Sequence, residues 1–280
     1  MIEKEILKEV SSRILQNKTP VLQTGFKNLD IALSGIEKTS IITVGARPAM
    51  GKSCFMSNIM LNLLQQNKKC MYFSLEMSIQ QFLKRLLGQI SELDFYTLNN
   101  SDIISNSWKY SEMIKEAVDN LSEYNLTIYD EIINIDKIQE KIEQERPDFV
   151  FIDYLQLIET PNKRPRTESF EKIMLNLKKI SKNNNCIIFV ISELSRMLES
   201  RCDRKPLLSD LRESGAIENI SDVVMFIYRD AYYYDYRPNE EKDSNLKGKT
   251  EIIIAKNKYG PNCKVKLLFR DSIMKFLEPI

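Results

Sequence analysis

The sequence predicts an α/β fold with a mostly parallel, twisted sheet and helices on both faces. Three observations lead to this prediction. Short apolar segments rich in β-branched and aromatic residues alternate with helical segments. The first of these strands runs into a tight turn containing Gly and Pro, and then into a helix. Three strands end at or near a carboxylate. Right-handed crossovers bring the carboxyl ends of parallel strands to one edge of the sheet, where ligands bind.

The chain is predicted to divide into an N-terminal segment, residues 1–19, and one large domain, residues 20–280. Apolar residues recur at helical spacing over 2–16, which predicts an amphipathic helix followed by a polar connector. A short helix cannot bury its apolar face alone, so we expect it to dock either on a neighbouring subunit or on its own domain. The pattern favours neither alternative.

Within the large domain, strands and helices alternate after residue 40. Continuous apolar runs are typical of strands that are buried on both faces of a parallel sheet. Ser78 is predicted to cap a helix that extends to about residue 90. The other expected strands cover 69–75, 126–129, 148–157, 186–192, 222–228 and 251–255, with 265–269 as a terminal hairpin partner; the other expected helices cover 136–144 and 168–182, and residues 91–125 are polar and helical.

The stretch 40–60 contains the strongest functional motif. Its turn, ARPAMGKS over 46–53, fits a Walker A pattern in which alanine replaces the first glycine and Gly45 precedes it. In such a loop the backbone N–H groups and the N-terminus of the following helix form a positive cradle for phosphate oxygens. We expect Lys52 to contact the β- and γ-phosphates and the Ser53 hydroxyl to bind Mg²⁺. The alternative is a plain turn.

Three carboxylates are predicted to share the edge of the sheet that carries this loop. Asp153 ends a hydrophobic strand, the form of a Walker B carboxylate that orients Mg²⁺ and its waters. Glu76 ends the neighbouring strand and is expected to polarise an attacking water, and Glu193 follows a third strand. A buried carboxylate near a triphosphate is costly unless it works there. For a single acid at the end of a strand, the alternative is a helix cap or a surface ion pair.

Composition excludes several classes of function. The chain has no histidine, which excludes Ser-His-Asp and Cys-His catalysis and leaves any general base to a carboxylate or a lysine. The five cysteines are scattered without C-x-x-C spacing, which predicts reduced structural thiols. No apolar run approaches about 18 residues, and the N-terminus is too charged for a signal peptide. We therefore expect a cytoplasmic protein with no membrane contact.

Charge is balanced overall but is uneven along the chain. The formal net charge is only +1, which argues neither for nor against a nucleic-acid partner. Lysine and arginine concentrate over 161–166, 201–205 and 247–270. Such clusters are usually solvated faces, and a nucleic-acid surface is the alternative.

Several longer motifs resemble those of the bacterial replicative DNA helicases of the DnaB type. They are TGFKNLD (24–30), FSLEMS (73–78), Arg85, DYLQL (153–157), SELSR (192–196), KPLLSDLRESGAIENISDVVMFIYRD (205–230) and IIIAKNKYGP (252–261), in family order over about residues 20–270. The resemblance implies a RecA-like P-loop ATPase core. It also implies a ring hexamer that binds ATP between subunits and pulls single-stranded DNA through its channel during replication, with primase or a helicase loader as possible partners.

The resemblance further assigns roles to individual residues. Glu76 matches the family's catalytic glutamate, Asp153 its Walker B aspartate, and Arg85 an arginine near the nucleotide. The loop at 212–215 matches one that touches the DNA backbone, although by itself it would be interpreted as an ion-paired surface turn. The assigned residues are Ala46, Arg47, Pro48, Ala49, Met50, Gly51, Lys52, Ser53, Cys54 and Arg85 for ATP, Ser53 and Asp153 for Mg²⁺, and Arg212, Glu213 and Gly215 for DNA.

Two residues depart from the family pattern. The sensor glutamine is Glu193 here, and an ionised glutamate only accepts hydrogen bonds and adds negative charge near the γ-phosphate. The arginine finger is Lys258, with Lys256 matching the accompanying lysine. An arginine finger is worth roughly 10³ to 10⁵ in rate, and lysine lacks its planar bidentate fork. We therefore expect a slow ATPase, with Glu193, Lys256 and Lys258 joining Lys52 and Glu76 as catalytic residues.

The sequence thus predicts an ATP-dependent DNA helicase motor domain, and two other functions stay open. A RecA-family strand-exchange or repair ATPase shares the Walker motifs but not SDLRESG. An ATP-binding regulatory or structural subunit with weak or no hydrolysis is favoured only by Glu193 and Lys258. The family's separate N-terminal helical domain has no counterpart in this sequence, so the chain is expected to be either part of a longer protein or a short paralogue.

Overall fold

The computed structural model describes residues 11–12, 22–33, 36–159, 166–211, 214–234 and 248–279, and the following account concerns these residues. Almost all of the predicted helix over 2–16 therefore lies outside the described residues, as do the basic positions 161–165.

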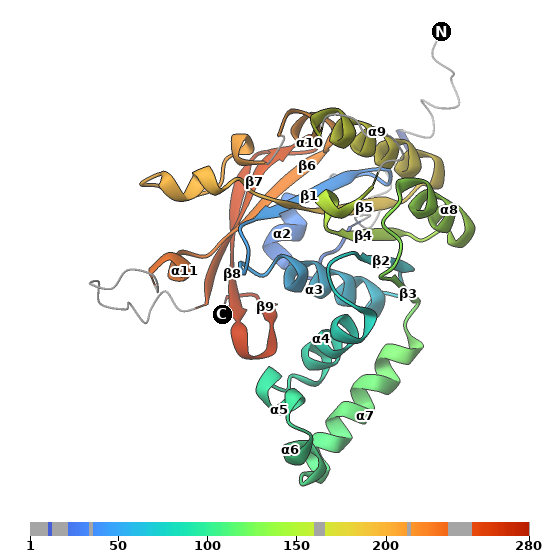
Figure 1. The fold of residues 1–280 in the computed structure, drawn as a ribbon, viewed down its shortest axis with the longest axis vertical. Helices are drawn as coiled ribbons and strands as arrows, with labels where there is room; N and C mark the ends of the chain where they lie inside the picture. Colours follow the sequence, from blue (N-terminus) through green and yellow to red (C-terminus); the bar gives the residue numbers. More distant parts are fainter. Residues whose placement is uncertain are drawn as a thin grey trace.

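A single mixed sheet runs through the described part of the chain (Figure 1). Its strand order is β3-β2-β4-β5-β1-β6-β7-β8-β9, and the pairs from β3 to β6 are parallel. The pairs from β6 to β9 are antiparallel. The strands are β1 (Ile41–Ala46), β2 (Cys70–Ser74), β3 (Leu126–Tyr129), β4 (Phe149–Asp153), β5 (Ile187–Glu193), β6 (Val223–Tyr228), β7 (Lys249–Asn257), β8 (Cys263–Arg270) and β9 (Lys275–Leu277).

Helices cover both faces of the sheet (Figure 1). The first face carries α2 (Lys27–Ala32), α3 (Lys52–Gln65) and α4 (Ile79–Ser91), and the second carries α8 (Ile135–Glu145), α9 (Arg166–Asn184) and α10 (Ser214–Ile220). A lobe made of α5 (Phe95–Asn99), α6 (Ser101–Ser105) and α7 (Trp108–Glu123) projects away from the sheet beyond α4. The short elements are α11 (Asp230–Tyr234) and the 3₁₀ helices η1 (Leu155–Leu157), η2 (Arg196–Ser200), η3 (Leu208–Asp210) and η5 (Asp271–Ile273).

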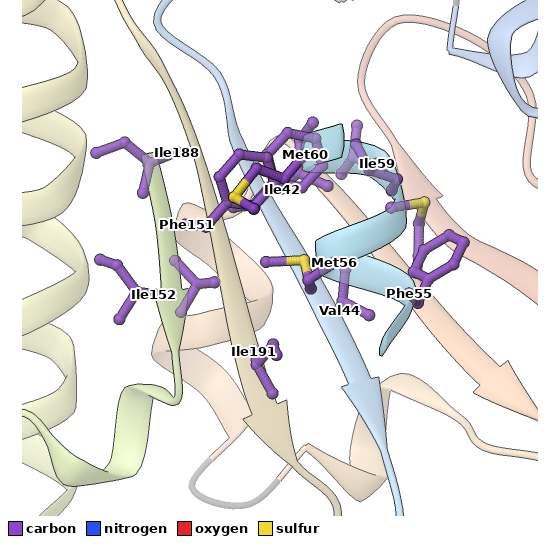
Figure 2. Close-up of a cluster of buried hydrophobic side chains, with 14 of the residues drawn as sticks. Ile42, Val44, Phe55, Met56, Ile59, Met60, Phe151, Ile152, Ile188 and Ile191 are labelled. Atoms are coloured by element: carbon purple, nitrogen blue, oxygen red, sulfur yellow. The ribbon is translucent and has the colours of Figure 1, made fainter. Parts of the chain in front are cut away.

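The core lies between the central strands and the helices on each face. Figure 2 shows the side chains of α3, among them Met56 and Met60, against Ile42 of β1 and Phe151 of β4. Ile152 points to the opposite face of the sheet, as the alternation of side chains along a strand requires. Every residue of β1, β2, β4 and β6 is buried. This explains their continuous apolar runs, because a strand covered on both faces has no solvent-facing positions.

The predicted mostly parallel sheet with helices on both faces is confirmed, and most predicted elements occur within a few residues of their expected bounds. Ser78 caps α4 through a capping box, in which Gln81 N donates to Ser78 Oγ and Ser78 N donates to Gln81 Oε1. The elements α2, α10, α11 and β9 were not predicted, since each is too short to show a periodic pattern. Among the described residues, none of the helices is long and apolar enough to cross a membrane.

Replacing Phe151 by alanine should destabilise the fold strongly. The Phe151 side chain is fully buried and stacks on Phe189 with 5.0 Å between ring centroids. The Phe151→Ala variant should lose about 3–5 kcal/mol of unfolding free energy, because truncation leaves a cavity in a close-packed core. Urea unfolding with an unchanged m-value checks this. The matched control, Trp108→Ala at an 82% exposed position, should stay within about 0.5 kcal/mol of wild type. Equal losses in the two variants would contradict the assignment of the core.

Candidate active site

The phosphate loop lies between the carboxyl end of β1 and the first residue of α3. Gly51, the residue before the helix, has φ +94°, and Ala49 has φ +61°. No side chain caps α3 at Gly51, so its first N–H groups keep their donor capacity for a ligand. A Cβ on Gly51 would approach the Phe276 ring to 3.1 Å. Both the backbone conformation and this close approach favour glycine. The loop therefore has the geometry of an anion-binding helix N-terminus.

A cavity of about 470 Å³ opens above this loop. This volume falls within the range of sites for small molecules and cofactors, about 300–1,000 Å³. The loop and the helix it starts form one wall, strand ends form another, and the turn between β8 and β9 forms a third. The lining residues are Pro48, Ala49, Gly51, Lys52, Ser53, Cys54, Glu76, Met77, Arg85, Tyr154, Glu193, Arg229, Phe269, Asp271 and Met274.

The register of the parallel strands brings the predicted carboxylates to this cavity. Asp153 pairs with Ser74 in β2, and Glu193 pairs with Ala46 at the end of β1. Glu76 follows β2 by two residues. Burial lowers the pKa of Lys52 below its usual value, and the negative charges of Asp153, Glu193 and Glu76 oppose that shift in this order. Lys52 thus lies among all three predicted acids.

Asp153 is the most deeply buried of these acids, with 1% of its surface exposed. Tyr72 Oη donates to its Oδ2 at 2.8 Å, whereas its buried Oδ1 has no hydrogen-bond partner among the described residues. Burial raises the pKa of Asp153, and the Ser53 and Tyr72 hydroxyls and the Lys52 charge act against this. Mg²⁺ takes one or two protein oxygens and keeps several waters. The unpartnered Asp153 oxygen beside Ser53 fits such an ion, although the described residues contain no cluster of three acidic or thiol ligands.

Glu76 lies at the exposed mouth of the cavity. Partial burial raises the pKa of its carboxyl, and the negative charge of Asp153 raises it further, while Lys52 and Arg85 lower it. A carboxylate with a raised pKa is a better proton acceptor at neutral pH than an ordinary one. Arg85 reaches the same cavity from α4, and its buried Nε has no partner among the described residues.

Glu193 is held at the end of β5 by a bridge from the neighbouring strand. Glu193 N donates to Gln156 Oε1 at 3.3 Å, and Gln156 Nε2 donates to Ser192 Oγ at 3.0 Å. Gln156 lies in η1, within the DYLQL motif that begins at Asp153, so one amide side chain joins the ends of β4 and β5. The next residue, Leu194, forms an antiparallel bridge with Leu211.

Three of the loop residues predicted to contact ATP do not line the cavity. Ala46 and Met50 are buried in the core. The Arg47 side chain turns away, where its Nε donates to Glu199 Oε1 at 2.9 Å and its Nη1 to the Leu194 carbonyl at 2.9 Å. Any contact of these three residues with a nucleotide would therefore come from their backbone.

Lys256 and Lys258 lie at the amino ends of the parallel strands, whereas the phosphate loop lies at their carboxyl ends. Strand β7 runs antiparallel to β6, so its carboxyl end pairs with the amino end of β6 at Val223. Lys258 Nζ donates to Asp222 Oδ1 at 2.9 Å, and Lys256 Nζ donates to the Glu218 carbonyl at 2.5 Å. Neither lysine reaches the cavity of its own chain.

The predicted DNA loop is described only in part. Arg212 and Glu213 lie outside the described residues, whereas Gly215 lies in α10, is exposed, and has open space where a Cβ would lie. The segment that leads to this loop is well anchored. Arg201 donates to both carboxylate oxygens of Asp210, at 3.1 and 2.6 Å.

Neither Arg229 nor the residues of the third wall were predicted from the sequence. Arg229 stacks over the Phe269 ring at 4.4 Å and donates to Asp271 Oδ1 at 2.7 Å and to the Ala49 carbonyl at 3.4 Å. Arg229 directly follows the carboxyl end of β6, so the rule that located the acids would also have located it. Phe269, Asp271 and Met274 come from the antiparallel end of the sheet, where no sequence signal indicates contact with the cavity.

Comparison with known proteins identifies close relatives. A family model described as the DnaB-like helicase C terminal domain matches residues 21–278. A probable replicative DNA helicase of Trieres chinensis is 35% identical over 286 residues, which cover 99% of this chain and 61% of the relative. The replicative DNA helicase DnaB of Geobacillus stearothermophilus is 35% identical over 264 residues, covering 91% of this chain and 56% of the relative. The chain thus spans less than two thirds of the length of these curated relatives.

Solved structures agree with these sequence matches. One of them, the structure of an ATPase domain, superposes with a TM-score of 0.89 at 29% identity, covering 99% of this chain and 98% of that domain. A DnaB-like replicative helicase, whose structure was described with its interactions with primase, superposes with a TM-score of 0.88 at 29% identity. That match covers 100% of this chain and 67% of the other.

The Asp222 cluster generates a prediction about stability and pH. Burial raises the pKa of Asp222, but hydrogen bonds from Lys178, Ile41 N and Lys258 outweigh it and hold the pKa below its usual value. A depressed pKa stabilises the fold above the unfolded-state pKa, and this contribution disappears as pH falls through the folded-state pKa. Asp222→Asn should cost about 3 kcal/mol at pH 7, and the difference from wild type should shrink below pH 3.8. Urea unfolding at several pH values measures it. A constant difference, or an equal loss in the exposed-site control Asp119→Asn, would contradict the prediction.

Proposed function

The chain belongs to the DnaB-like helicase C-terminal domain family, and from this premise we propose that it is a motor domain that hydrolyses ATP to translocate on single-stranded DNA during replication. The observation that carries the proposal is the cavity in which the phosphate loop, Lys52 and the acids Glu76 and Glu193 converge above the buried Asp153. Ring assembly as a hexamer and contact with primase or a loader are part of the proposal. So is a cytoplasmic location, in keeping with the five free cysteines.

The phosphate loop would hold the triphosphate of ATP. The N–H groups at the start of α3 point into a site with no competing cap, and Lys52 would contact the β- and γ-phosphates. Ser53 and Asp153 would hold Mg²⁺, which would neutralise developing charge on the phosphates. Phe269 and Met274 supply apolar side chains to the lining of the cavity, and a nucleobase would make the apolar contacts there that are usual in ligand sites.

Glu76 would orient and deprotonate the water that attacks the γ-phosphate. It lies at the mouth of the cavity, and the raised pKa of its carboxyl suits a proton acceptor at neutral pH. Lys52 would remain at the phosphates throughout, so the charge that develops in the transition state would meet a fixed cation. Glu193, whose charge also acts on Lys52, would sense the γ-phosphate less well than the family glutamine, because a carboxylate cannot donate.

Lys256 and Lys258 would act on the site of a neighbouring subunit. Their place at the edge opposite the phosphate loop prevents them from reaching the cavity of their own chain. In a ring each subunit presents one edge to the next, which is a heterologous interface that closes on itself. The single-stranded DNA would be held by Arg212, Glu213 and Gly215, mainly through its phosphates, and its affinity would fall steeply with salt.

A regulatory subunit that binds ATP without turnover is the second candidate. The specific observation in its favour is that Lys258, in place of the family arginine, is paired with the buried Asp222. Intact Lys52, Glu76 and Asp153 argue for hydrolysis. Turnover itself separates the two functions.

Turnover with single-stranded DNA should depend on Glu76. We expect ATP hydrolysis at a protein concentration that supports assembly, stimulation by a single-stranded oligonucleotide, and a loss of about 10²- to 10⁴-fold in Glu76→Gln, because the variant lacks the general base. A steady-state phosphate-release assay measures this. Glu92→Gln, another exposed carboxylate, is the matched control and should match wild type. ATP binding without turnover in wild type would support the regulatory subunit instead.

A second test addresses the proposed action between subunits. Lys258→Ala and Glu76→Gln should each be nearly inactive alone, because one lacks the cation from the neighbour and the other lacks the base. Mixed rings should recover activity, since about one interface in four then joins an intact Glu76 to an intact Lys258. Lys258→Arg should exceed wild type at least about tenfold, because the guanidinium restores the bidentate fork. Absence of recovery on mixing would exclude the action of Lys258 in trans.

A further inference from the structure

We propose that Arg47 is a positioning residue that couples phosphate binding to the affinity for single-stranded DNA. Its backbone belongs to the phosphate loop, whereas its side chain holds the segment that leads to the predicted DNA loop. The proposal rests on the proposed function, since it requires both an ATP site and a DNA site.

The Arg47 side chain bridges two segments that are far apart in the sequence. Its guanidinium donates to the Leu194 carbonyl at 2.9 Å and to Glu199 Oε1 at 2.9 Å. The side chain is 11% exposed, so burial holds it in this arrangement. A guanidinium presents its donors in a fixed planar fork. A shift of the Arg47 backbone is therefore transmitted to the segment after β5 more rigidly than a flexible lysine side chain would allow.

The segment held by Arg47 is tied to the residue that precedes the DNA loop. Leu194 forms an antiparallel bridge with Leu211, and Ser195 N donates to the Asp210 carbonyl at 2.7 Å. Leu211 directly precedes Arg212 in the chain. Arg47 thus donates a hydrogen bond to one side of this backbone bridge, at Leu194. The other side, at Leu211, continues into the predicted DNA loop.

The phosphate side of Arg47 is also defined by a contact. Lys52 Nζ donates to the Arg47 carbonyl oxygen at 3.3 Å. The Lys52 ammonium has three N–H donors, and a phosphate that draws this group toward itself would lengthen the 3.3 Å contact with the carbonyl. Phosphate binding therefore changes the interactions of the Arg47 peptide group directly. Through its contacts with Leu194 and Glu199, the Arg47 side chain would pass this change on to the segment after β5.

Space is present for the movement that such coupling requires. A second cavity, of about 330 Å³, lies between the phosphate loop and the start of this segment; it is lined by Arg47, Pro48, Glu193, Leu194, Ser195 and Arg196. A packed core would resist a shift here, because close-packed interiors deform little. This route uses the side chain of Arg47 and does not require Glu193 to sense the γ-phosphate.

The two contacts of Arg47 should contribute unequally to the coupling between phosphate and DNA binding. Glu199 is 46% exposed, and an exposed ion pair contributes little. The Leu194 carbonyl bond is part-buried, and losing it leaves a polar group without its partner. Removal of Glu199 should therefore weaken the coupling, whereas removal of the guanidinium should abolish it.

The test compares DNA affinity with and without nucleotide. The dissociation constant of a fluorescein-labelled oligo-dT is measured by anisotropy in the absence and presence of Mg²⁺ and a non-hydrolysable ATP analogue, and the ratio is the coupling factor. Wild type should show at least about a fivefold ratio. The Arg47→Met ratio should fall to about one, Arg47→Lys should be intermediate, and Glu199→Ala should lose about half of the factor. Glu92→Ala removes a comparable exposed ion pair with Lys275 and should leave the ratio unchanged.

Separate measurement of nucleotide binding distinguishes coupling from damage to the site. Arg47→Met should bind a fluorescent ATP analogue within about tenfold of wild type, and Glu199→Ala should add no further loss of coupling in the Arg47→Met background, because both act through one contact. A wild-type ratio in Arg47→Met, or loss of its nucleotide binding, would overturn the proposal alone. If the DNA affinity of the wild-type protein does not change with nucleotide, both this proposal and the proposed function would be overturned.

Discussion

The parallel register of β2, β4, β5 and β1 is the constraint on which the candidate site depends. It places Asp153 beside Ser74 and Glu193 beside Ala46, so that residues from distant parts of the chain share one rim with the phosphate loop. A slip of one residue would turn every side chain of a strand to the other face. Because both faces of these strands are buried against helices (Figure 2), such a slip would disrupt two layers of packing at once. The core therefore determines the geometry of the site.

This geometry collects like charges at an energetic cost. Asp153 is buried with an unpartnered oxygen, and Glu76 and Glu193 lie close enough to influence Lys52. Burial raises the pKa values of both Asp153 and Glu76, and the charges of Asp153 and Glu193 raise that of Glu76 further, although Lys52 and Arg85 act against these shifts. Perturbed acids that surround a lysine in a cleft are typical of functional sites. A divalent cation would supply positive charge against these acids, and that cation, Lys52 and Arg85 would together face the negative charge of a polyphosphate.

The two edges of the parallel strands present different chemistry. The carboxyl edge carries the phosphate loop and the acids, and the amino edge carries Lys256 and Lys258 around the buried Asp222. In the proposed ring these edges would face each other across each interface, and each chain would supply part of two sites. Within one chain, the ladder between Leu194 and Leu211 extends from the end of β5 toward the predicted DNA loop. Arg47 joins that ladder to the phosphate loop.

The sequence by itself determined the class of fold, most of the elements and the centre of the site. Continuous apolar runs indicate strands with two buried faces. The Walker A motif can be recognised because its residues are close together in the sequence and form one local loop. The sequence therefore located Lys52, Ser53, Glu76 and Asp153 on one rim, and the resemblance of longer motifs indicated the family.

Only the tertiary structure decided which side chains face the cavity. Arg47 lies within the motif, yet its side chain contacts Leu194 and Glu199, which are far from it in the sequence. Arg229 follows β6 within the 205–230 motif, where it was assigned no role, and Phe269 lies in β8, which carries no motif. The position of Lys258 at the far edge follows from the antiparallel direction of β7. These features depend on contacts between residues far apart in the chain, and local patterns contain no information about such contacts.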